Sequence, residues 1–337
     1  MASATATLEP VAVAISLPAC IEDLSHQKYT MKIVSLLPSA TEIVYALGLG
    51  EELLAVTHEC DYPSGASEKP VITSSILEHS ESSSLQIHKG ITGLIHEGKS
   101  IYHLNEKLLA EIKPDLILTQ ELCDVCAVSY NIVLEAAKIL EGDQEIISLE
   151  PHFFRDVLSN ILLVGEKTDK SSEAKRLVDS LEKRITFIEN NTCKLTVRPK
   201  VYCMEWIDPP FAAGHWISEM VAIAGGQEGL AIKGQPSVQI NWQDVVDYAP
   251  EILVFMPCGF GLDRAVAEAK QVQGWPGWPD LPAVKKNQVY AVDGSSFFNR
   301  PGPRLVDGLE ILAQILNPEI FSSILPRKNY QRIHFVC

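Results

Sequence analysis

Short apolar runs alternate with amphipathic segments along the first half of the chain. Continuous apolar runs of about four to eight residues are typical of strands buried on both faces, and an i, i+3, i+4 spacing is typical of helices. The runs predict strands at Lys32–Leu37, Leu53–Thr57, Asp115–Thr119 and Glu145–Leu149. The spacing predicts a helix that begins at Ser39, with Glu42 completing a capping box, and helices over residues 105–112 and 127–140. This alternation predicts a parallel sheet covered by helices on both faces.

The pattern changes to nearly uninterrupted helix between Phe153 and Asn191. The second part of this segment carries an apolar stripe at helical spacing, formed by Ala174, Leu177, Val178, Leu181, Ile185 and Ile188. A second set of strands follows at Lys200–Glu205, Glu251–Met256 and Gln288–Val292, with helices at Ile217–Ala224 and Arg304–Leu316. We therefore predict an α/β protein with two Rossmann-like lobes that contain parallel sheets and are joined by a single long interlobe helix.

These elements divide the chain into five parts. Residues 1–30 are predicted to form a flexible N-terminal extension, and residues 31–168 the N-terminal α/β lobe. Residues 169–194 form the linking helix, residues 195–325 the C-terminal α/β lobe, and residues 326–337 a tail.

Composition and charge restrict the partners of such a protein. The chain has 337 residues, of which 46% are hydrophobic, and a net charge of −15 at pH 7. Binding to a phosphate backbone or to an anionic membrane surface needs clustered Lys and Arg, which an acidic chain does not favour. No apolar run reaches the roughly 18–20 residues of a membrane span. We therefore expect a small-molecule ligand, no nucleic acid and no membrane insertion.

The N-terminus bears on the compartment. Val11–Leu17 is apolar and ends in the sequence LPAC, but a secretory signal begins with basic residues, and the first basic residue here is Lys28. A plastid transit peptide would be rich in Arg, whereas this segment contains Glu9, Glu22 and Asp23. We therefore expect a cytoplasmic protein. A plastid location, or export through a weak N-terminal signal, is the alternative.

The unusual residues nearly all follow the predicted strands. In open α/β sheets ligands bind beyond the carboxyl ends of the strands, so the corresponding loops of two facing lobes line one cleft. Six segments have this position: LLPSATE, HECDYP, TQELCDVCA, MEWIDPPFAAGHW, MPCGF and DGSSFFNRPGPR. From them we expect the ligand to contact Ser39, His58, Glu205, Trp206, His215, Trp216, Phe260, Asn299, Arg300 and Arg304.

Each of these assignments has a structural alternative. Trp206 and Trp216 would supply apolar contact to a flat ligand, or would be core aromatics. Arg300 and Arg304 would meet an anionic group at the start of the last long helix, or would flank a capped helix start exposed to solvent. His215 would contact the ligand or have a structural role.

The cysteines raise the question of a metal. Cys123 and Cys126 form a C-x-x-C motif after a strand, and Cys60 and Cys258 follow other strands. The spacing of a local zinc site, with a second C-x-x-C or a His pair, is absent from the sequence. The four thiols could still converge with His58 on a metal ion. Dithiol redox chemistry, contact with the cargo and packing of the pocket floor are the other possibilities.

An enzyme that uses the same cleft is the alternative to a binding protein. Glu205 and His215 could act as general base and orienting partner, and Cys123, Cys60 or Cys258 as nucleophile. The sequence contains no G-x-S-x-G or H-E-x-x-H motif. We therefore expect a binding protein without catalytic residues and keep the enzyme as the open alternative.

Three longer stretches resemble a known family. They are KIVSLLPSATEIVYALGLGEELLAVTHECDYP, IYHLNEKLLAEIKPDLILTQELCDVCAVS and VYAVDGSSFFNRPGPRLVDGLEILAQIL. They resemble the periplasmic binding proteins for cobalamin, haem and iron-siderophores, most closely the cobalamin-binding-like branch, over about Met31–Pro318. The resemblance implies two Rossmann-like lobes joined by one long helix, with limited hinge motion and a ligand clamped between them. It also implies a cobalamin-like, haem-like or metal-chelate ligand, with cobalamin or a bound metal as the cofactor, and a transport permease as partner.

Overall fold

The computed structural model describes residues 30–76, 82–97, 100–121, 130–137, 144–322 and 329–335. Residues Met31–Cys337 form one compact unit, which is distinct from Met1–Thr30. The predicted extension at residues 1–30 lies outside the described residues except for Thr30. The boundaries predicted between the lobes and the linking helix remain predictions.

The N-terminal lobe is built on a parallel sheet with the strand order β2-β1-β5-β6. These strands are β1 (Ile33–Ser35), β2 (Leu53–Ala55), β5 (Leu116–Thr119) and β6 (Glu145–Ser148), each within a predicted strand. Alternate side chains of β1 enter different clusters, because Ile33 packs with α1 (Pro38–Ala46) and α5 (Asp156–Lys167) while Val34 packs with α3 (Glu106–Ile112) and α4 (Tyr130–Ala137). Helices therefore cover both faces of the sheet, as the continuous apolar runs predict.

The first helix begins differently from the predicted capping box. Leu37 is the N-cap of α1 and Pro38 occupies its first turn, so Ser39 lies inside the helix. Proline suits this place because its fixed φ matches the helix and its missing N–H would have no intrahelical partner. Glu42, the other half of the predicted box, bonds instead to a residue of the C-terminal lobe, Arg304.

The N-terminal lobe carries a helical insertion between two short strands, β3 (Thr73–Ser75) and β4 (Tyr102–Leu104). The two strands pair antiparallel, and α2 (Ser84–His96) lies between them in the sequence. Ser83 caps this helix and forms a complete capping box with Gln86. No helix is predicted from the sequence at the residues of α2.

The C-terminal lobe contains a mixed sheet with the strand order β10-β8-β7-β11-β12-β13, in which β9 also pairs with β7. The predicted strands form its parallel centre as β7 (Lys200–Trp206), β11 (Ile252–Phe255) and β12 (Val289–Val292). Short strands complete the sheet: antiparallel β8 (Phe211–Ala212), β10 (Val238–Gln239) and β13 (Tyr330–Arg332), and parallel β9 (Gln227–Glu228). The parallel sheet predicted for this lobe therefore has antiparallel edges.

Helices cover both faces of this second sheet. One face packs on α7 (Ile217–Ile223) and α12 (Leu305–Leu316), and the other on α8 (Trp242–Tyr248), α9 (Leu262–Ala269) and α10 (Pro282–Lys285). The remaining short helices are η1 (Ser64–Glu68), η2 (Lys270–Gly274), η3 (Trp278–Asp280), α11 (Gly294–Phe297) and α13 (Pro318–Phe321).

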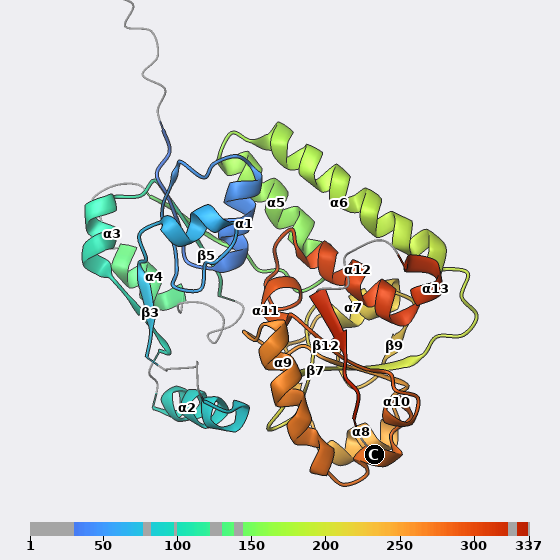
Figure 1. Ribbon diagram of the computed structural model, residues 1–337. Helices are drawn as coiled ribbons and strands as arrows, with labels where there is room; N and C mark the ends of the chain where they lie inside the picture. Colours follow the sequence, from blue (N-terminus) through green and yellow to red (C-terminus); the bar gives the residue numbers. More distant parts are fainter. Residues whose placement is uncertain are drawn as a thin grey trace, which may run out of the picture. The chain divides into compact units, whose positions relative to one another are not determined.

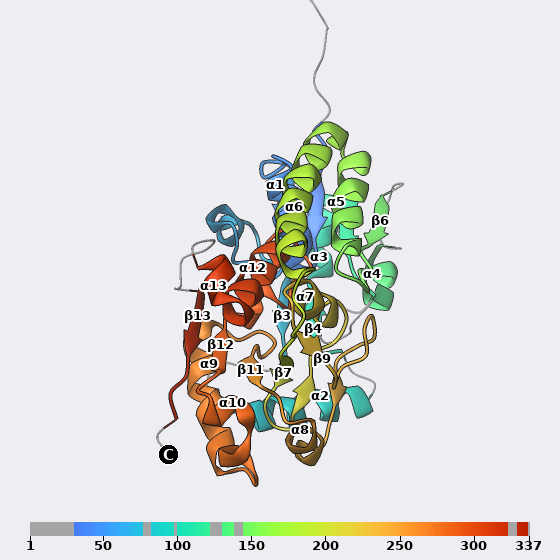
Figure 2. The same ribbon diagram turned by 90° about the vertical axis from the view of Figure 1, so that its right-hand side faces the viewer.

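The predicted linking helix is α6 (Ser171–Thr192), which packs along α5 and α12 (Figures 1 and 2). Its apolar stripe is confirmed, because Ala174, Leu181, Ile185 and Ile188 are buried in the same cluster as residues of both sheets. Charged contacts add to this packing: Arg184 donates to Glu310 of α12 at 2.8 Å and also pairs with Asp307. The hydrogen bonds that Arg184 donates to Glu310 raise the pKa of Arg184.

The Arg184 contacts give a stability prediction. Arg184→Ala would leave Glu310, which is 6% exposed, without its charged partner, so we expect the free energy of unfolding to fall by about 1–3 kcal/mol in urea titrations. Arg176→Ala on the same helix is the control, because Arg176 is 72% exposed and pairs with Glu173 one turn away. A change of less than about 0.5 kcal/mol is expected for the control, and equal losses in both variants would contradict the assignment.

Candidate functional site

The segments that the sequence singles out do follow the carboxyl ends of the parallel strands. In the N-terminal sheet β1 ends before Leu36, β2 before Val56 and β5 before Gln120; in the C-terminal sheet β7 ends at Trp206, β11 before Met256 and β12 before Asp293. Because parallel strands place their carboxyl ends at one edge, each sheet gathers three of these segments at the edge where α/β proteins bind ligands.

Arg304 joins the two lobes through a forked ion pair with Glu42. Its Nη2 and Nε lie 2.6 and 3.1 Å from the two carboxylate oxygens, and its guanidinium lies 3.9 Å from the centre of the Tyr62 ring. Both side chains are buried, with 13% of Arg304 and 3% of Glu42 exposed. Burial raises the pKa of Glu42, and the bonds from Arg304 act in the opposite direction. A carboxylate held in this way needs the guanidinium to remain charged.

Arg300 makes a second contact between the lobes. Its Nη1 pairs with Asp61, and its Nη2 donates to the main-chain oxygen of Glu59 at 3.0 Å. Burial opposes the charge of Arg300, but the bond to Asp61 together with the charges of Asp61, Glu42 and Glu59 outweighs it, so the pKa of Arg300 is raised. A ligand anion would therefore compete with Asp61 and Glu42 for the two arginines, and their contact with a ligand stays a prediction.

Ser39 lies beneath the turn that carries these arginines. It is 2% exposed, and a Cβ placed on Gly302 would lie 3.4 Å from the Ser39 Cα and 3.2 Å from a Glu42 oxygen. The turn can approach α1 this closely because residue 302 has no side chain. Ser39 is thus covered by the protein itself in this structure.

An aromatic group lies at the end of β7. The rings of Trp206 and Phe260 are 5.4 Å apart, and the guanidinium of Arg264 lies 3.7 Å from the centre of the Phe260 ring. Phe260 is only 2% exposed, whereas Trp206 is half-buried and donates its indole N–H to the main-chain oxygen of Ser84 at 3.2 Å. Of the two rings, Trp206 is therefore the one that retains accessible aromatic surface.

Trp216 has the environment of a core aromatic residue, which was the structural alternative to ligand contact. It is 5% exposed, belongs to the main hydrophobic cluster and donates its indole N–H to the main-chain oxygen of Phe298 at 2.9 Å. A buried Trp with its one donor satisfied is typical of a core position.

Glu205 and His215 occupy one loop but have separate partners. The Glu205 carboxylate accepts the Gly214 N–H at 3.1 Å, and burial raises its pKa. The His215 ring stacks on Trp216 at 5.3 Å, and its Nδ1 is buried without a hydrogen-bond partner. Burial lowers the pKa of His215, and the nearby His152 adds to the effect. Among the hydrogen bonds of the described residues none joins Glu205 to His215, so the base and orienting partner proposed for an enzyme are not assembled here.

His58 is held at the end of β2 by contacts on two sides. Its Nδ1 lies 2.8 Å from the Thr73 hydroxyl, and its ring lies 5.5 Å from the Tyr102 ring. Burial lowers its pKa, with Glu59 opposing the shift. Asn299 follows β12, and its side-chain oxygen is buried without a hydrogen-bond partner. Both residues lie in segments that follow strands, and their contact with a ligand stays a prediction.

Cys60 and Cys258 are the candidate metal ligands among the cysteines that the structure describes. The Cys60 sulfur is 3.1 Å from the hydroxyls of Thr41 and Thr57, and burial raises its pKa. Cys258 is half-buried and donates its main-chain N–H to the Glu205 carbonyl at 3.0 Å. Cys123 and Cys126 lie outside the described residues. Within the part of the chain that is described, no three His, Cys, Asp or Glu side chains are placed to hold a metal ion.

Several residues that hold the predicted site residues in place were not predicted from the sequence. Glu42, Asp61 and Tyr62 hold the two arginines, and Arg264 covers Phe260. Helix α2 was also not predicted, although the Ser83–Gln86 pair has the spacing of a capping box and could have revealed the helix start.

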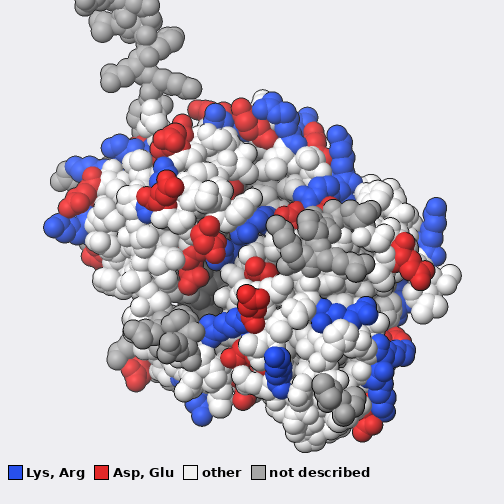
Figure 3. Space-filling model, in the orientation of Figure 1, with Lys and Arg blue, Asp and Glu red and all other residues white. Residues whose placement is uncertain are grey.

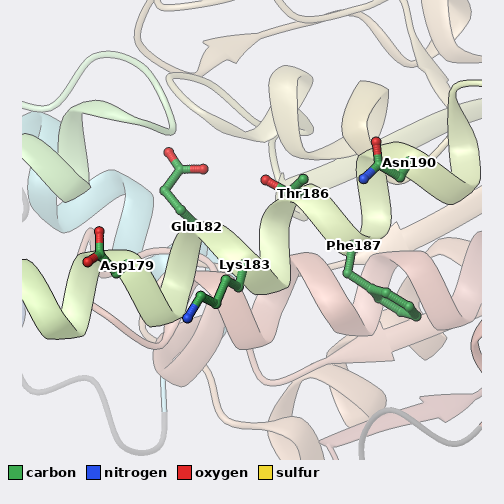
Figure 4. Close-up of a pocket in the computed structure, with 6 residues that line it drawn as sticks. All are labelled: Asp179, Glu182, Lys183, Thr186, Phe187 and Asn190. Carbon is green, nitrogen blue, oxygen red and sulfur yellow. The ribbon is translucent and has the colours of Figure 1, made fainter.

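A surface hollow of about 570 Å³ lies elsewhere, along α6. Figure 4 shows that the six residues lining it, Asp179, Glu182, Lys183, Thr186, Phe187 and Asn190, all come from this one helix. Specific ligand pockets gather polar groups from several elements, and this hollow does not. On the face drawn in Figure 3, Lys and Arg side chains are interspersed with Asp and Glu rather than forming a basic patch.

Comparison with known proteins identifies relatives over most of the chain. The profile of a family described as periplasmic binding protein matches residues 33–295. The uncharacterised ABC transporter substrate-binding lipoprotein YvrC of Bacillus subtilis is 28% identical over 90% of this chain and 87% of its own length. The vitamin B12-binding protein of Vibrio cholerae is 26% identical over 83% of this chain and 86% of its own length. The structure of IsdE of Staphylococcus aureus in complex with haem has a TM-score of 0.63 at 18% identity, and the match covers 85% of this chain and 99% of that one.

The comparisons correct the expected compartment. The prediction of a cytoplasmic protein is wrong, because the matching family is described as periplasmic and the relative from Bacillus subtilis is a lipoprotein. Among the described residues, none of the helices has the length and apolar character needed to cross a bilayer.

The Arg304–Glu42 pair gives a prediction for the join between the lobes. Arg304→Met should lower the free energy of unfolding by about 3 kcal/mol in urea titrations, because the buried Glu42 carboxylate loses its counter-charge. Glu42→Met combined with Arg304→Met should recover most of this loss, since no buried charge then remains. Additive losses in the double variant would show that the two side chains are not coupled.

His215 gives a pH prediction. Because its pKa is lowered in the folded state, the unfolded state binds more protons below about pH 6.5, and stability should fall as the pH falls. His215→Asn should reduce the loss of unfolding free energy between about pH 7.5 and 5.5, and Asn tolerates the φ of 50° at this position. His103→Gln, at an exposed site, serves as the control and should lose as much as the unmodified protein. An unchanged slope in His215→Asn would contradict the prediction.

Proposed function

The chain belongs to the periplasmic binding protein family, and from this premise we propose that it binds a cobalamin-like or haem-like ligand at the carboxyl ends of its two sheets. The match to a vitamin B12-binding protein over most of both chains supports this ligand class. The solved haem complex with the same fold supports the inclusion of haem among the candidates.

The observation that carries the proposal is the half-buried Trp206 at the carboxyl end of β7. Its ring packs against Phe260, and its indole N–H donates to the Ser84 carbonyl in this structure. A rigid indole with remaining accessible surface suits one face of a large, flat and partly apolar macrocycle.

His58 is the side chain that we expect to approach the metal centre of such a ligand. Burial favours its neutral form, and we assign its Nδ1–H as the donor to Thr73, which leaves Nε2 as the free acceptor. Nε2 lies 3.7 Å from a Glu59 oxygen, beyond hydrogen-bonding distance. A neutral imidazole whose other nitrogen is fixed by a hydrogen bond is the usual state of a histidine ligand to a metal.

The same premise gives the biological role. The relative from Bacillus subtilis is named as the substrate-binding lipoprotein of an ABC transporter. We therefore propose that this protein delivers its ligand to a membrane permease and that it has no catalytic step of its own. The separate partners of Glu205 and His215 agree with this role.

Equilibrium dialysis with cyanocobalamin and with haemin tests the proposal. We expect micromolar or tighter binding of at least one of them, and an approximately tenfold or greater loss of affinity in Trp206→Ala. Phe187→Ala is the matched control, because Phe187 is an aromatic residue that is 54% exposed on α6, and it should bind as the unmodified protein does. The absence of binding of both probes would overturn the proposed ligand class.

A further inference from the structure

Helix α2 belongs to the N-terminal lobe by sequence but contacts the C-terminal lobe. It lies in the insertion between β3 and β4, whose strands extend away from the parallel sheet of the first lobe. Figure 1 shows α2 near α9 and far from α6. The two lobes are therefore connected by α2 as well as by α6 and by the Arg300 and Arg304 contacts.

Three hydrogen bonds attach the start of α2 to the second lobe. Arg264 of α9 donates to the Ser82 carbonyl at 2.7 Å, and Trp206 donates to the Ser84 carbonyl at 3.2 Å. The Ser84 hydroxyl donates to the Glu268 carboxylate at 3.3 Å, and Ser84 itself is fully buried. One turn later the His88 ring meets the edge of Phe211 at 5.9 Å. These contacts come from β7, β8 and α9, so α2 spans several elements of the second lobe.

Two of the three bonds end on main-chain carbonyls at the start of α2, those of Ser82, just before the N-cap, and of Ser84, the first helical residue. The helix start is fixed independently, because the Ser83 hydroxyl accepts from the Gln86 N–H while the Gln86 side chain accepts from the Ser83 N–H. The carbonyls are thus held in place by the helix itself, and their strength as acceptors does not depend on its side chains. Substitutions in the second lobe are therefore the direct way to release α2.

Trp206 connects this attachment to the proposed ligand site. The indole that we assign to ligand contact is the same indole that holds the Ser84 carbonyl, and Phe260 beside it is covered by Arg264, which holds Ser82. The wall of the site and the attachment of α2 thus share side chains, so a change in one is expected to affect the other.

We propose that α2 is a strap that bridges the two lobes on the side away from α6 and controls how fast ligand enters and leaves. This inference rests on the proposed function for the ligand, although the bridge itself does not. A ligand as large as a tetrapyrrole enters when the bonds to Arg264, Trp206 and Glu268 break and α2 moves off the second lobe. The bonds re-form when the ligand is in place, so the strap slows both directions of exchange.

Hydrogen exchange of the ligand-free protein tests the bridge. Arg264→Ala removes the shortest of the three bonds, and we expect amides within residues 84–96 to exchange about three- to tenfold faster, with those of α6 unchanged. Glu268→Ala should have the same effect in smaller degree. Arg332→Ala is the matched control, because Arg332 also stacks on an aromatic ring, that of Tyr290, at 5.2 Å but has no contact with α2. Unchanged exchange of α2 in Arg264→Ala would overturn the strap.

Stopped-flow binding of cyanocobalamin and haemin tests the gating. Arg264→Ala should raise the association and dissociation rates together by about three- to tenfold, so that Kd changes by less than either rate. Rates equal to those of the unmodified protein would overturn the gating. If the unmodified protein binds neither probe while exchange in α2 responds to Arg264→Ala, the bridge stands and the proposed ligand class falls.

Discussion

A single hydrophobic cluster holds both sheets to the same long helix. It contains Ile33 and Leu118 from the first sheet, Val254 and Val292 from the second, and Ile185 from α6. Burial of apolar surface is the dominant favourable term in folding, so separating the lobes at this end would expose a large part of the core. This constraint explains why the strand ends of one lobe lie within hydrogen-bonding reach of the turn after β12 in the other.

The buried ion pairs fix the relative orientation of the groups that they join, which apolar packing does not do. Hydrophobic contacts tolerate small rotations, whereas the fork between Arg304 and Glu42 requires two N–H groups to meet two oxygens at once. The desolvation of such a pair offsets much of its attraction, so its main effect is on geometry rather than on net stability. With Arg300 and Asp61 it selects one arrangement of the loops around Tyr62.

The backbone architecture could be predicted from the sequence because its signals are local. Continuous apolar runs gave the parallel strands, and one stripe of apolar residues gave α6. The capping box at Ser39 failed because Pro38 competes for the same place in the first turn. Helix α2 was not predicted, although Ile87, Ile91, Leu94 and Ile95 recur at helical spacing after the Ser83–Gln86 capping box.

The sequence predicts which segments form the candidate site, but not which side chains contact one another within it. Trp206, His58 and Arg304 were identified because they follow strands, which is a topological signal. Their partners were not identified, since Glu42 lies 262 positions from Arg304 and no local pattern joins them. Trp206 and Trp216 share one loop and one chemistry yet differ in burial, because the turn of the chain through β8 decides which indole enters the core.

The attachment of α2 through its main-chain carbonyls has a consequence for how such proteins diverge. Because Arg264 and Trp206 recognise Ser82 and Ser84 by backbone oxygen, the side chains along the rest of this helix can be exchanged without loss of the attachment. Selection for a new cargo can therefore act on α2 while the hold on the second lobe persists. In α2, the proposed strap, we therefore expect substitutions of exposed side chains to have little effect on its attachment to the second lobe.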